Sequence, residues 1–331
     1  MIITRTPFRI SFFGGGTDFP EWFIKNDGAV LTSAIDKYCY ISCRKLPPFF
    51  EYKYRIVWSR IELVNDKSDI FHPSVRETLK YLDDDNSYEI SHNADLPARS
   101  GLGSSSAFTV GLLNALYAIR GQIVENTRLA DEAIHIERNL NKEAVGYQDQ
   151  IIASHGGFNK IVFNKNQSYT VKPIVIARSR LQDLEGNLML FFTGFSRFSS
   201  DITEKHVQNI NKNDLILEKM YELVDISIEL LQGEKDISNF GHLMHETWSL
   251  KKTLSSAVST TEIDDIYNKG IKNGAIGGKI LGAGGGGFIL FYVPKDQQDK
   301  VRKSLKDLIH VPFTFENSGS KVVLYQPGGL D

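Results

Sequence analysis

The sequence predicts an α+β protein with two domains, and three observations support this prediction. The chain has 331 residues, more than a single hydrophobic core usually organises. In its first half, strand-like segments lead into a glycine-rich loop and then an apolar helix. In its second half, the expected order of strand, helix, helix, strand, helix and strand is typical of a ferredoxin-like layer. The stretch 164–173 is polar, and we place the boundary there, between domains 1–168 and 169–331.

The composition is ordinary for a soluble globular protein and argues against several classes of function. Hydrophobic residues make up 41% of the chain, charged residues make up 24%, and the formal net charge is −2. This balance does not indicate nucleic acid or an anionic membrane as a partner. No apolar run reaches membrane-spanning length and the first ten residues do not resemble a signal peptide, so we expect a cytoplasmic protein.

Two cysteines, Cys39 and Cys43, lie four positions apart on one expected strand. Their side chains face the same side, but they are too far apart along an extended chain for a disulfide to form easily. We therefore expect two buried thiols, which suits a reducing compartment. The eight histidines show no metal-ligand spacing apart from the weak pair His242 and His245.

The N-terminal half begins with a segment, residues 7–18, that carries polar groups in costly positions. Its sequence is PFRISFFGGGTD, in which Arg9 lies beside buried strand residues and Asp18 follows a glycine turn directly. Two interpretations stay open. Asp18 is a turn former or the N-cap of a helix over 21–26, or both residues belong to a functional site. The strands expected in this half are 2–6, 29–44, 53–64, 88–95 and 158–163, with a short helix over 74–82.

The central segment, residues 97–107, has the sequence PARSGLGSSSA and runs into an apolar helix over 108–119. Gly101 and Gly103 carry no side chains, so backbone N–H groups can crowd around an anion there. The serines that follow stand where a helix begins, and a helix start offers unpaired N–H donors and partial positive charge. A polyphosphate site and a simple helix-capping turn are both consistent with this pattern. The segment is neither a Walker A motif nor a dinucleotide fingerprint.

Two carboxylates that follow this helix are candidates for a functional role. Glu137 lies on the apolar side of a helix expected over 128–142, where it is exposed beside Arg138, pairs with an Arg or Lys side chain, or holds a metal ion. Asp149 stands near a helix start in GYQDQ, between glycine turns, where it is either a capping residue or a base.

The second half contains one unusual segment, GGKILGAGGGGF at residues 277–288. Glycine loses much conformational entropy on folding, so such a run indicates a backbone that approaches something closely. An apolar strand follows at once, which argues against a flexible linker. The strands expected here are 171–176, 187–193, 288–293 and 322–325, and the helices are 201–209, 215–232, 237–254, 261–273 and 297–308.

Together, the segments 7–18, 97–107 and 279–288 resemble the three motifs of the GHMP small-molecule kinases. Their order and spacing extend the resemblance over essentially the whole chain, and the pattern P-x-x-x-G-L-G-S-S-S-A is highly specific. Within this superfamily, stretches such as HIERN, GYQDQ and TGFSRFSSDI are most similar to the D-glycero-α-D-manno-heptose 7-phosphate kinases. The fucokinases are similar to much of the same sequence. The resemblance implies a two-domain GHMP kinase fold, with a ribosomal-protein-like N-terminal domain and a ferredoxin-like C-terminal domain.

The resemblance also implies roles for the nucleotide side of the site. ATP would be bound by a continuous stretch, namely Gly101, Leu102, Gly103, Ser104, Ser105 and Ser106. Ser105 and Glu137 would share Mg²⁺, which neutralises charge between the β- and γ-phosphates. Asp149 would take the proton of the attacking hydroxyl, and Arg9 beside it would keep that carboxylate ionised and offset charge on the phosphoryl group. Trp58 is a candidate for the adenine.

On the acceptor side, the resemblance implies that Asp18 receives sugar hydroxyls, with Thr17, Gly16 and Gly285 lining the pocket. The galactokinase motif ends in Glu-His-Thr-Asp, whereas glycines replace its first two residues here, which favours a bulkier or differently placed sugar. Arg197 is a candidate for a phosphate on the substrate because an arginine fork fits phosphate geometry. Arg99, Lys25 and Lys279 are the other candidates for this phosphate.

We therefore expect an ATP-dependent kinase that phosphorylates the anomeric hydroxyl of heptose 7-phosphate for surface polysaccharide synthesis. A fucokinase or another anomeric sugar kinase is the alternative within the class. A non-catalytic sensor of sugar and ATP is the alternative outside it, although binding alone does not require a base. The expected partners are small molecules, and the sequence is compatible with a homodimer without determining it.

Overall fold

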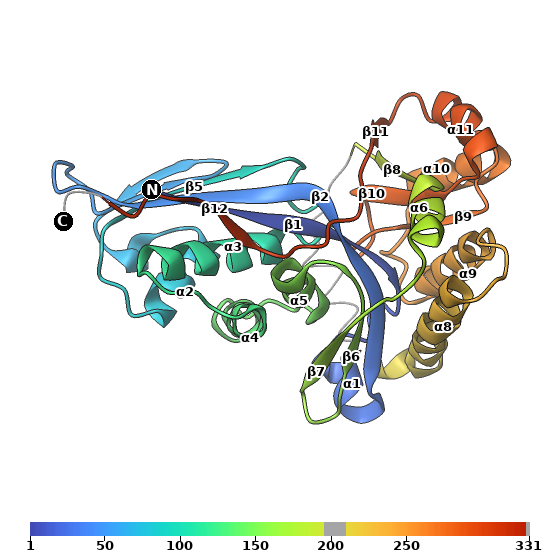
Figure 1. Cartoon of the computed structure of the whole chain (residues 1–331), viewed down its shortest axis with the longest axis horizontal. Helices are drawn as coiled ribbons and strands as arrows, with labels where there is room; N and C mark the ends of the chain where they lie inside the picture. The colour runs from blue at the N-terminus through green and yellow to red at the C-terminus, as the bar shows by residue number, and fades with distance from the viewer. Residues whose placement is uncertain (195–209, 329–331) are drawn as a thin grey trace.

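The computed structural model describes residues 1–194 and 210–328, and it places two β-sheets side by side with helices around them (Figure 1). The first sheet has the strand order β12-β1-β2-β5-β3-β4, and β6 and β7 extend it from β2. Its strands are β1 (Ile2–Phe13), β2 (Gly28–Lys45), β3 (Tyr54–Val57), β4 (Ile61–Val64), β5 (Tyr88–Ala94), β6 (Phe158–Phe163), β7 (Tyr169–Pro173) and β12 (Lys321–Tyr325).

The long antiparallel pair β1 and β2 is the frame of this sheet. The first part of β2 pairs with β6 and its second part pairs with β5, so one strand serves two branches of the sheet. The register between β1 and β2 shifts at Pro7, which has no N–H to give to the ladder. A second shift between Ser11 and Phe13 lies where β1 ends and the glycine turn of residues 14–16 begins.

Helix α3 (Ser104–Ile119) lies against this sheet and is apolar on nearly all sides, because other helices cover its outer face. It approaches β1 closely at Gly111, whose carbonyl accepts a hydrogen bond of 2.9 Å from the Thr4 hydroxyl. The neighbouring helical elements are α1 (Pro20–Asn26), α2 (Pro73–Tyr81), α4 (Asn126–His135), the π-helical turn η2 (Ile136–Leu140) and α5 (Gln148–His155).

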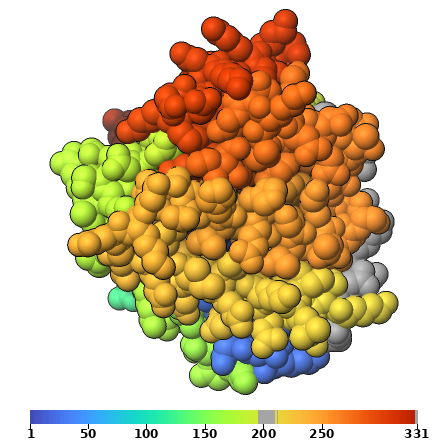
Figure 2. Space-filling model, turned by 90° about the vertical axis from the view of Figure 1, so that its right-hand side faces the viewer, coloured from blue at the N-terminus to red at the C-terminus, as the bar shows by residue number. Residues whose placement is uncertain are grey.

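The second sheet is antiparallel and has the order β11-β8-β10-β9, as expected of a ferredoxin-like layer. Its strands are β8 (Leu188–Phe192), β9 (Gly277–Ile280), β10 (Phe288–Tyr292) and β11 (Ile309–Val311). Its helices are α6 (Arg178–Gly186), α8 (Asp214–Gln232), α9 (Asn239–Thr253), α10 (Thr261–Lys272) and α11 (Gln298–Ser304). Figure 2 shows residues of this half covering most of the face opposite α3, with a small area of N-terminal residues below them.

One cluster of buried hydrophobic residues runs through both halves. The ring of Phe12 from β1 lies 5.5 Å from Phe240 of α9 and 6.1 Å from Phe315, near the C-terminal end, in edge-to-face geometry. Across the same seam, the Lys279 ammonium donates a hydrogen bond of 2.8 Å to the Phe12 carbonyl. Lys279 is therefore buried between the sheets, and its ammonium is used within the protein rather than presented to a substrate phosphate.

Several expectations need correction. The segment 53–64 is a hairpin of two strands, β3 and β4, rather than one strand. The expected boundary at residue 168 lies between β6 and β7, which pair with each other, and β12 returns to pair with β1. The division of the chain into domains at residue 168 stays a prediction, although strand pairing places β7 and β12 in the first sheet. Local patterns did not reveal α6, β9 and β11, and the helix expected over 201–209 lies outside the described residues.

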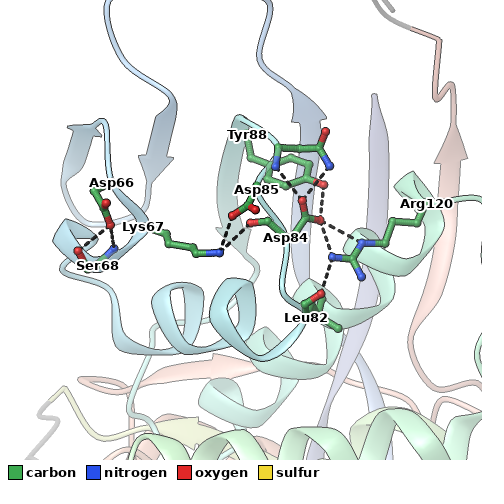
Figure 3. Close-up of polar contacts among 9 residues, drawn as sticks. Asp66, Lys67, Ser68, Leu82, Asp84, Asp85, Tyr88 and Arg120 are labelled. Carbon is green, nitrogen blue, oxygen red and sulfur yellow. Dashed lines mark hydrogen bonds and ion pairs between the residues drawn. The ribbon is translucent and has the colours of Figure 1, made fainter.

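The far end of α3 is fixed by a polar cluster around Asp84 (Figure 3). Asp84 is buried, and its carboxylate accepts hydrogen bonds from Tyr88 at 2.7 Å, from Arg120 at 2.7 and 3.0 Å and from Asn86. These bonds lower the pKa of Asp84 against the opposing effect of burial. The cluster ties the connection between α2 and β5 to the C-cap of α3.

Two further sequence expectations concern compartment. Cys39 and Cys43 are both buried and free, which confirms the expectation of two buried thiols. Over the residues that the structure describes, no helix combines the length and apolar character that a membrane crossing requires.

Candidate active site

The glycine loop before α3 has the conformation of an anion cradle. Gly101 and Gly103 adopt φ values of 84° and 75°, in the left-handed region that favours glycine. Gly103 is the N-cap of α3, and no side chain in the described part of the protein caps this helix end. The N–H groups of the first helical turn therefore have no partner within the helix and are available to an anion.

The third glycine segment supports this loop from the other half of the molecule. A Cβ atom on Gly101 would lie 2.5 Å from the Leu281 carbonyl oxygen, and one on Gly287 would lie 2.2 Å from that of Ser100. The Phe288 amide also donates a hydrogen bond of 3.2 Å to the Ser100 carbonyl. The expectation that the glycine run allows a close backbone approach is confirmed, because two main chains touch here without side chains between them.

An ion pair lies directly beneath the glycine loop. Arg9 of β1 donates hydrogen bonds of 2.7 Å to both carboxylate oxygens of Asp149, in the first turn of α5, and a third of 2.6 Å to the Gly101 carbonyl. A Cβ atom on Gly103 would lie 3.2 Å from Arg9 Cγ and 3.3 Å from Asp149 Oδ2. The Arg9 side chain is 6% exposed and that of Asp149 is 26% exposed, so the carboxylate is open to a ligand while the guanidinium is enclosed.

Asp18 lies near enough to Asp149 for the charge of that carboxylate to act on it. The amides of Gly16 and Gln148 donate hydrogen bonds to its two carboxylate oxygens, at 3.0 and 3.4 Å. Burial, and then the charge of Asp149, raise the pKa of Asp18 to about 6. Helix α1 has Phe19 as its N-cap, so Asp18 is not the helix cap that one interpretation expected.

Two other residues expected to line the acceptor pocket, Thr17 and Gly285, form hydrogen bonds within the protein instead. Thr17 is buried, and its single hydroxyl hydrogen is shared between the carbonyls of Gly14 and Ala29, at 2.8 Å each. Its side chain therefore holds the glycine turn together rather than facing a ligand. Gly285 is buried too, and its amide donates a hydrogen bond of 2.9 Å to the Val258 carbonyl. Gly16 takes part in the site through its amide bond to Asp18.

Glu137 is fully buried beside the start of α3, which excludes the solvent-exposed interpretation. One carboxylate oxygen accepts hydrogen bonds from the Ser106 hydroxyl at 2.8 Å and from the Gln150 amide at 2.5 Å. The structure thus brings Ser106 to Glu137, whereas Ser105, one position earlier, is exposed. Successive helical side chains point about 100° apart, so Ser105 points in a different direction from Ser106, and its sharing of a metal ion with Glu137 stays a prediction.

The environment of Glu137 fits a divalent cation. Its second carboxylate oxygen, Oε1, is buried without a hydrogen-bond partner among the described residues, as is Oε1 of Gln150. Burial, and then the charge of Glu143, raise the pKa of Glu137 to about 8, and a bound cation would reverse this shift. The described chain holds no cluster of three or more potential metal-ligating His, Cys, Asp or Glu side chains. One carboxylate, hydroxyls, water and phosphate oxygens are the donor set that suits Mg²⁺.

Two other sequence candidates have different outcomes. Arg197 lies outside the described residues, so its proximity to the site stays a prediction. Trp58 belongs to an aromatic cluster in which its ring stacks on Phe71 and meets His72 edge to face, at 6.2 and 4.8 Å. The ring of His72 in turn stacks on Phe108 of α3 at 4.5 Å, so this cluster adjoins the helix that begins at the glycine loop.

Sequence reasoning missed the roles of Ser106 and Gln150 in holding Glu137. The glutamines that flank Asp149 in GYQDQ were the available signal, because polar residues at the start of an otherwise apolar helix need partners. The partner of Gln150 is Glu137, 13 positions earlier on another helical element, and no local pattern identifies it.

Backbone amides arranged for a phosphate chain, next to a carboxylate that can take a hydroxyl proton, define a small-molecule phosphotransferase. The chain belongs to the GHMP kinase family. A model of the GHMP kinases N terminal domain matches residues 72–157, and a model of the GHMP kinases C terminal region matches residues 227–310. The protein is accordingly a phosphotransferase with an alcohol group as acceptor, and its two-domain fold is that of this family.

Similar proteins extend the match to the whole chain. A D-glycero-alpha-D-manno-heptose 7-phosphate kinase of Campylobacter jejuni is 31% identical over 97% of this chain and 98% of its own length. An L-fucokinase/L-fucose-1-P guanylyltransferase of Bacteroides fragilis is 26% identical over 90% of this chain and 35% of its own. The crystal structure of a D-glycero-D-manno-heptose 1-phosphate kinase from Bacteroides thetaiotaomicron, 23% identical, has the same fold with a TM-score of 0.72, covering 97% of this chain and 98% of that one.

Proposed function

We propose that the protein transfers the γ-phosphoryl group of ATP to the anomeric C1 hydroxyl of D-glycero-α-D-manno-heptose 7-phosphate, giving the 1,7-bisphosphate. The pairing of Arg9 with Asp149 beneath Gly103 is the observation that carries the chemistry. The identity of 31% to the Campylobacter enzyme supports the acceptor. The product would supply nucleotide-activated heptose for surface polysaccharide, and the free buried thiols of Cys39 and Cys43 suit a cytoplasmic enzyme.

The nucleotide phosphates would lie on the backbone of residues 101–106. Gly101 and Gly103 leave room for a close approach, and the amides at the start of α3 point at the bound anion. The third glycine segment packs against the backbone of this loop. The amide N–H donors are therefore in place before the nucleotide binds. Such preorganisation is the main contribution that a protein makes to phosphoryl transfer.

Asp149 would act on the acceptor. It accepts the C1 hydroxyl proton while the new bond forms between that oxygen and the γ-phosphorus, and the bond from phosphorus to the β–γ bridging oxygen breaks, releasing ADP. The partly exposed carboxylate then returns the proton to solvent. Arg9 keeps Asp149 oriented through two hydrogen bonds, and its charge offsets the negative charge that gathers at the transferred group.

Asp18 would fix the sugar by accepting hydrogen bonds from its hydroxyls. The glycines at positions 15 and 16 leave space for a sugar larger than galactose. We assign the 7-phosphate of the substrate to Arg197 as a proposal, because an arginine fork matches phosphate oxygens.

Glu137 and the serine hydroxyls at the start of α3, with Ser105 as the proposed ligand, would hold Mg²⁺. When bound, the ion neutralises charge between the β- and γ-phosphates. Ser106 and Gln150 support this arrangement by holding one oxygen of Glu137 while the other stays available.

A substrate panel tests this function. The purified protein is offered ATP, Mg²⁺ and each of heptose 7-phosphate, L-fucose, galactose and mevalonate, and the position of the product phosphate is read by NMR. We expect turnover of heptose 7-phosphate with phosphate on C1. Preferential turnover of L-fucose would replace the proposal with a fucokinase, the alternative that the Bacteroides fragilis relative supports. Binding of sugar and ATP without any product would favour the sensor and contradict the kinase.

A further inference from the structure

One arginine outside the reacting groups contacts both chain segments that surround Asp18. Arg138 follows Glu137 in the π-helical turn η2, and its side chain is 16% exposed. One terminal nitrogen, Nη1, donates a hydrogen bond to the Val145 carbonyl, and the other, Nη2, donates one of 2.7 Å to Glu21 of α1. The guanidinium also lies 5.8 Å from the centre of the Tyr147 ring.

The segment that Arg138 holds forms the wall behind Asp18. The Tyr147 amide donates a hydrogen bond of 3.0 Å to the Asp18 carbonyl, and the Gln148 amide donates one of 3.4 Å to its carboxylate. Gly146 lies so close that a Cβ atom there would be 1.9 Å from Asp18 Oδ2. The carboxylate position is thus determined by main-chain atoms of residues 146–148.

The second partner of Arg138, Glu21, belongs to the chain segment that follows Asp18. Glu21 is in the first turn of α1, three residues after Asp18, so the guanidinium fixes the chain that leads away from Asp18 as well as the wall facing it. The other carboxylate oxygen of Glu21 is buried without a hydrogen-bond partner in the described chain, which leaves Arg138 as the contact that holds it.

Consecutive residues of η2 therefore serve two sides of the site. Glu137 reaches Ser106 at the start of α3, on the nucleotide side, whereas Arg138 reaches the segments around Asp18, on the acceptor side. π-Helical turns occur frequently at functional sites, and in this one two neighbouring charged side chains lead to different segments.

We propose that Arg138 is a positioning residue for the acceptor sugar, which sets the Asp18 carboxylate by pinning residues 145–147 and α1 around it. This inference rests on the proposed function in one respect, namely that Asp18 binds the acceptor. The hydrogen bonds of Arg138 go to Val145 and Glu21, whereas those that join Arg9 to Asp149 and to the glycine loop do not involve it. Its loss should therefore weaken sugar binding and leave ATP binding unchanged.

The test measures KM for heptose 7-phosphate and for ATP in R138M, which keeps the apolar stem, and in R138K, which keeps the charge but not the fork. We expect the sugar KM to rise by about tenfold or more in R138M, the scale of one lost charged hydrogen bond, with the ATP KM within about twofold. R138K should restore little of the sugar affinity, because one ammonium group cannot reproduce the two hydrogen bonds of the guanidinium to Val145 and Glu21. R128M is the matched control, since Arg128 pairs with Glu132 on α4, and it should behave as wild type.

A second readout separates positioning from a general loss of folded protein. If the wall opens in R138M, water reaches Asp18, and the acid limb of kcat/KM moves from about pH 6 toward the range of an ordinary carboxyl group. Asp149 is the other charged group facing Asp18, and it is unchanged in this variant. A merely structural role would lower the amount of active enzyme without moving this limb, and that result would overturn the proposal.

G146A keeps the inference testable even if R138M does not fold. A methyl group at this position must displace the Asp18 carboxylate, and Gly146 does not have a left-handed φ that would add strain. We expect the same selective rise in sugar KM. If wild type phosphorylates the heptose, but R138M and G146A have the same KM for the sugar as wild type, the proposed role of Arg138 is rejected while the proposed function stands. If the panel identifies another sugar, the heptose assignment fails, and the same measurements with that sugar decide the role of Arg138.

Discussion

Arg9 holds both carboxylate oxygens of Asp149 at 2.7 Å, although 140 positions separate the two residues in sequence. Asp149 is the only one of the two with a substantially exposed side chain, so the pair presents a carboxylate whose orientation a buried arginine determines. Gly103 passes directly over both side chains. The base proposed for the hydroxyl proton and the proposed phosphate cradle are therefore a single packed unit, and changes in one are expected to disturb the other.

The first prediction concerns Asp149. D149N should fold and bind ATP as wild type does, while kcat falls by about 10³-fold, within the range that a general base contributes. Calorimetric titration with ATP and a coupled assay check both parts. D299N is the matched control, because Asp299 is exposed on α11, and its kcat should not change. Wild-type turnover in D149N would remove Asp149 as the base.

The second prediction concerns Glu137 and pH. Its pKa is raised to about 8 in the folded protein, so the stability that its protonated form contributes is lost as pH rises through about 8. Without metal, the free energy of unfolding of wild type should fall between about pH 5 and 8 and level off above that, and that of E137Q should fall less. Urea titrations at both pH values measure this difference. E137Q should also need more Mg²⁺ for half-maximal activity, and an unchanged Mg²⁺ requirement would contradict the assignment of Glu137 as a ligand.

The third prediction compares two glycines with similar backbone angles. Gly101 and Gly121 have φ values of 84° and 70°, but a Cβ atom would meet the Leu281 carbonyl at 2.5 Å in the first case and nothing within 4 Å in the second. G121A should cost only the strain of a left-handed residue, about 1 kcal/mol. G101A should cost more, because two main chains must separate, and it should also raise the KM for ATP. An equal loss of stability in G101A and G121A, measured by thermal unfolding, would show that the two glycine segments are not closely packed against each other.

The fourth prediction concerns the cluster around Asp84 (Figure 3). D84N breaks a buried ion pair with Arg120 and should lower the free energy of unfolding at pH 7 by about 3 kcal/mol. Since the pKa of Asp84 is lowered on folding, its contribution is present above the unfolded value and lost as pH falls through the folded one. The difference between D84N and wild type should therefore shrink in acid.

Asp85 provides the control for this prediction. It is the next residue, and its pair with Lys67 is exposed to solvent, so D85N should cost less than about 1 kcal/mol. Neither variant should change KM for either substrate, because the cluster lies at the opposite end of α3 from the glycine loop. A large change in KM for ATP in D84N would mean that the helix transmits the disturbance.

Much of the site was predictable because its motifs are local. The glycines at 101 and 103 identify a backbone that must adopt left-handed angles, and the apolar run after them identifies the helix whose start they form. The same reasoning could not choose between Ser105 and Ser106 as the neighbour of Glu137. That choice depends on how α3 is rotated against η2, which packing decides. Thr17 shows the same limit, since a hydroxyl beside Asp18 is equally suited to a ligand or to the turn that it holds.

By itself, the sequence determined the two-domain α+β architecture, the two buried thiols and the three glycine-containing segments, because each rests on periodicity or conformational freedom within a short stretch. Only the tertiary structure decided that β7 and β12 join the first sheet, that Ser106 reaches Glu137, and that Arg138 joins the segments around Asp18. These relations join segments that are far apart along the chain. They depend on which backbone groups and charges still need a partner once the core is packed, and neighbouring residues in sequence do not carry that information.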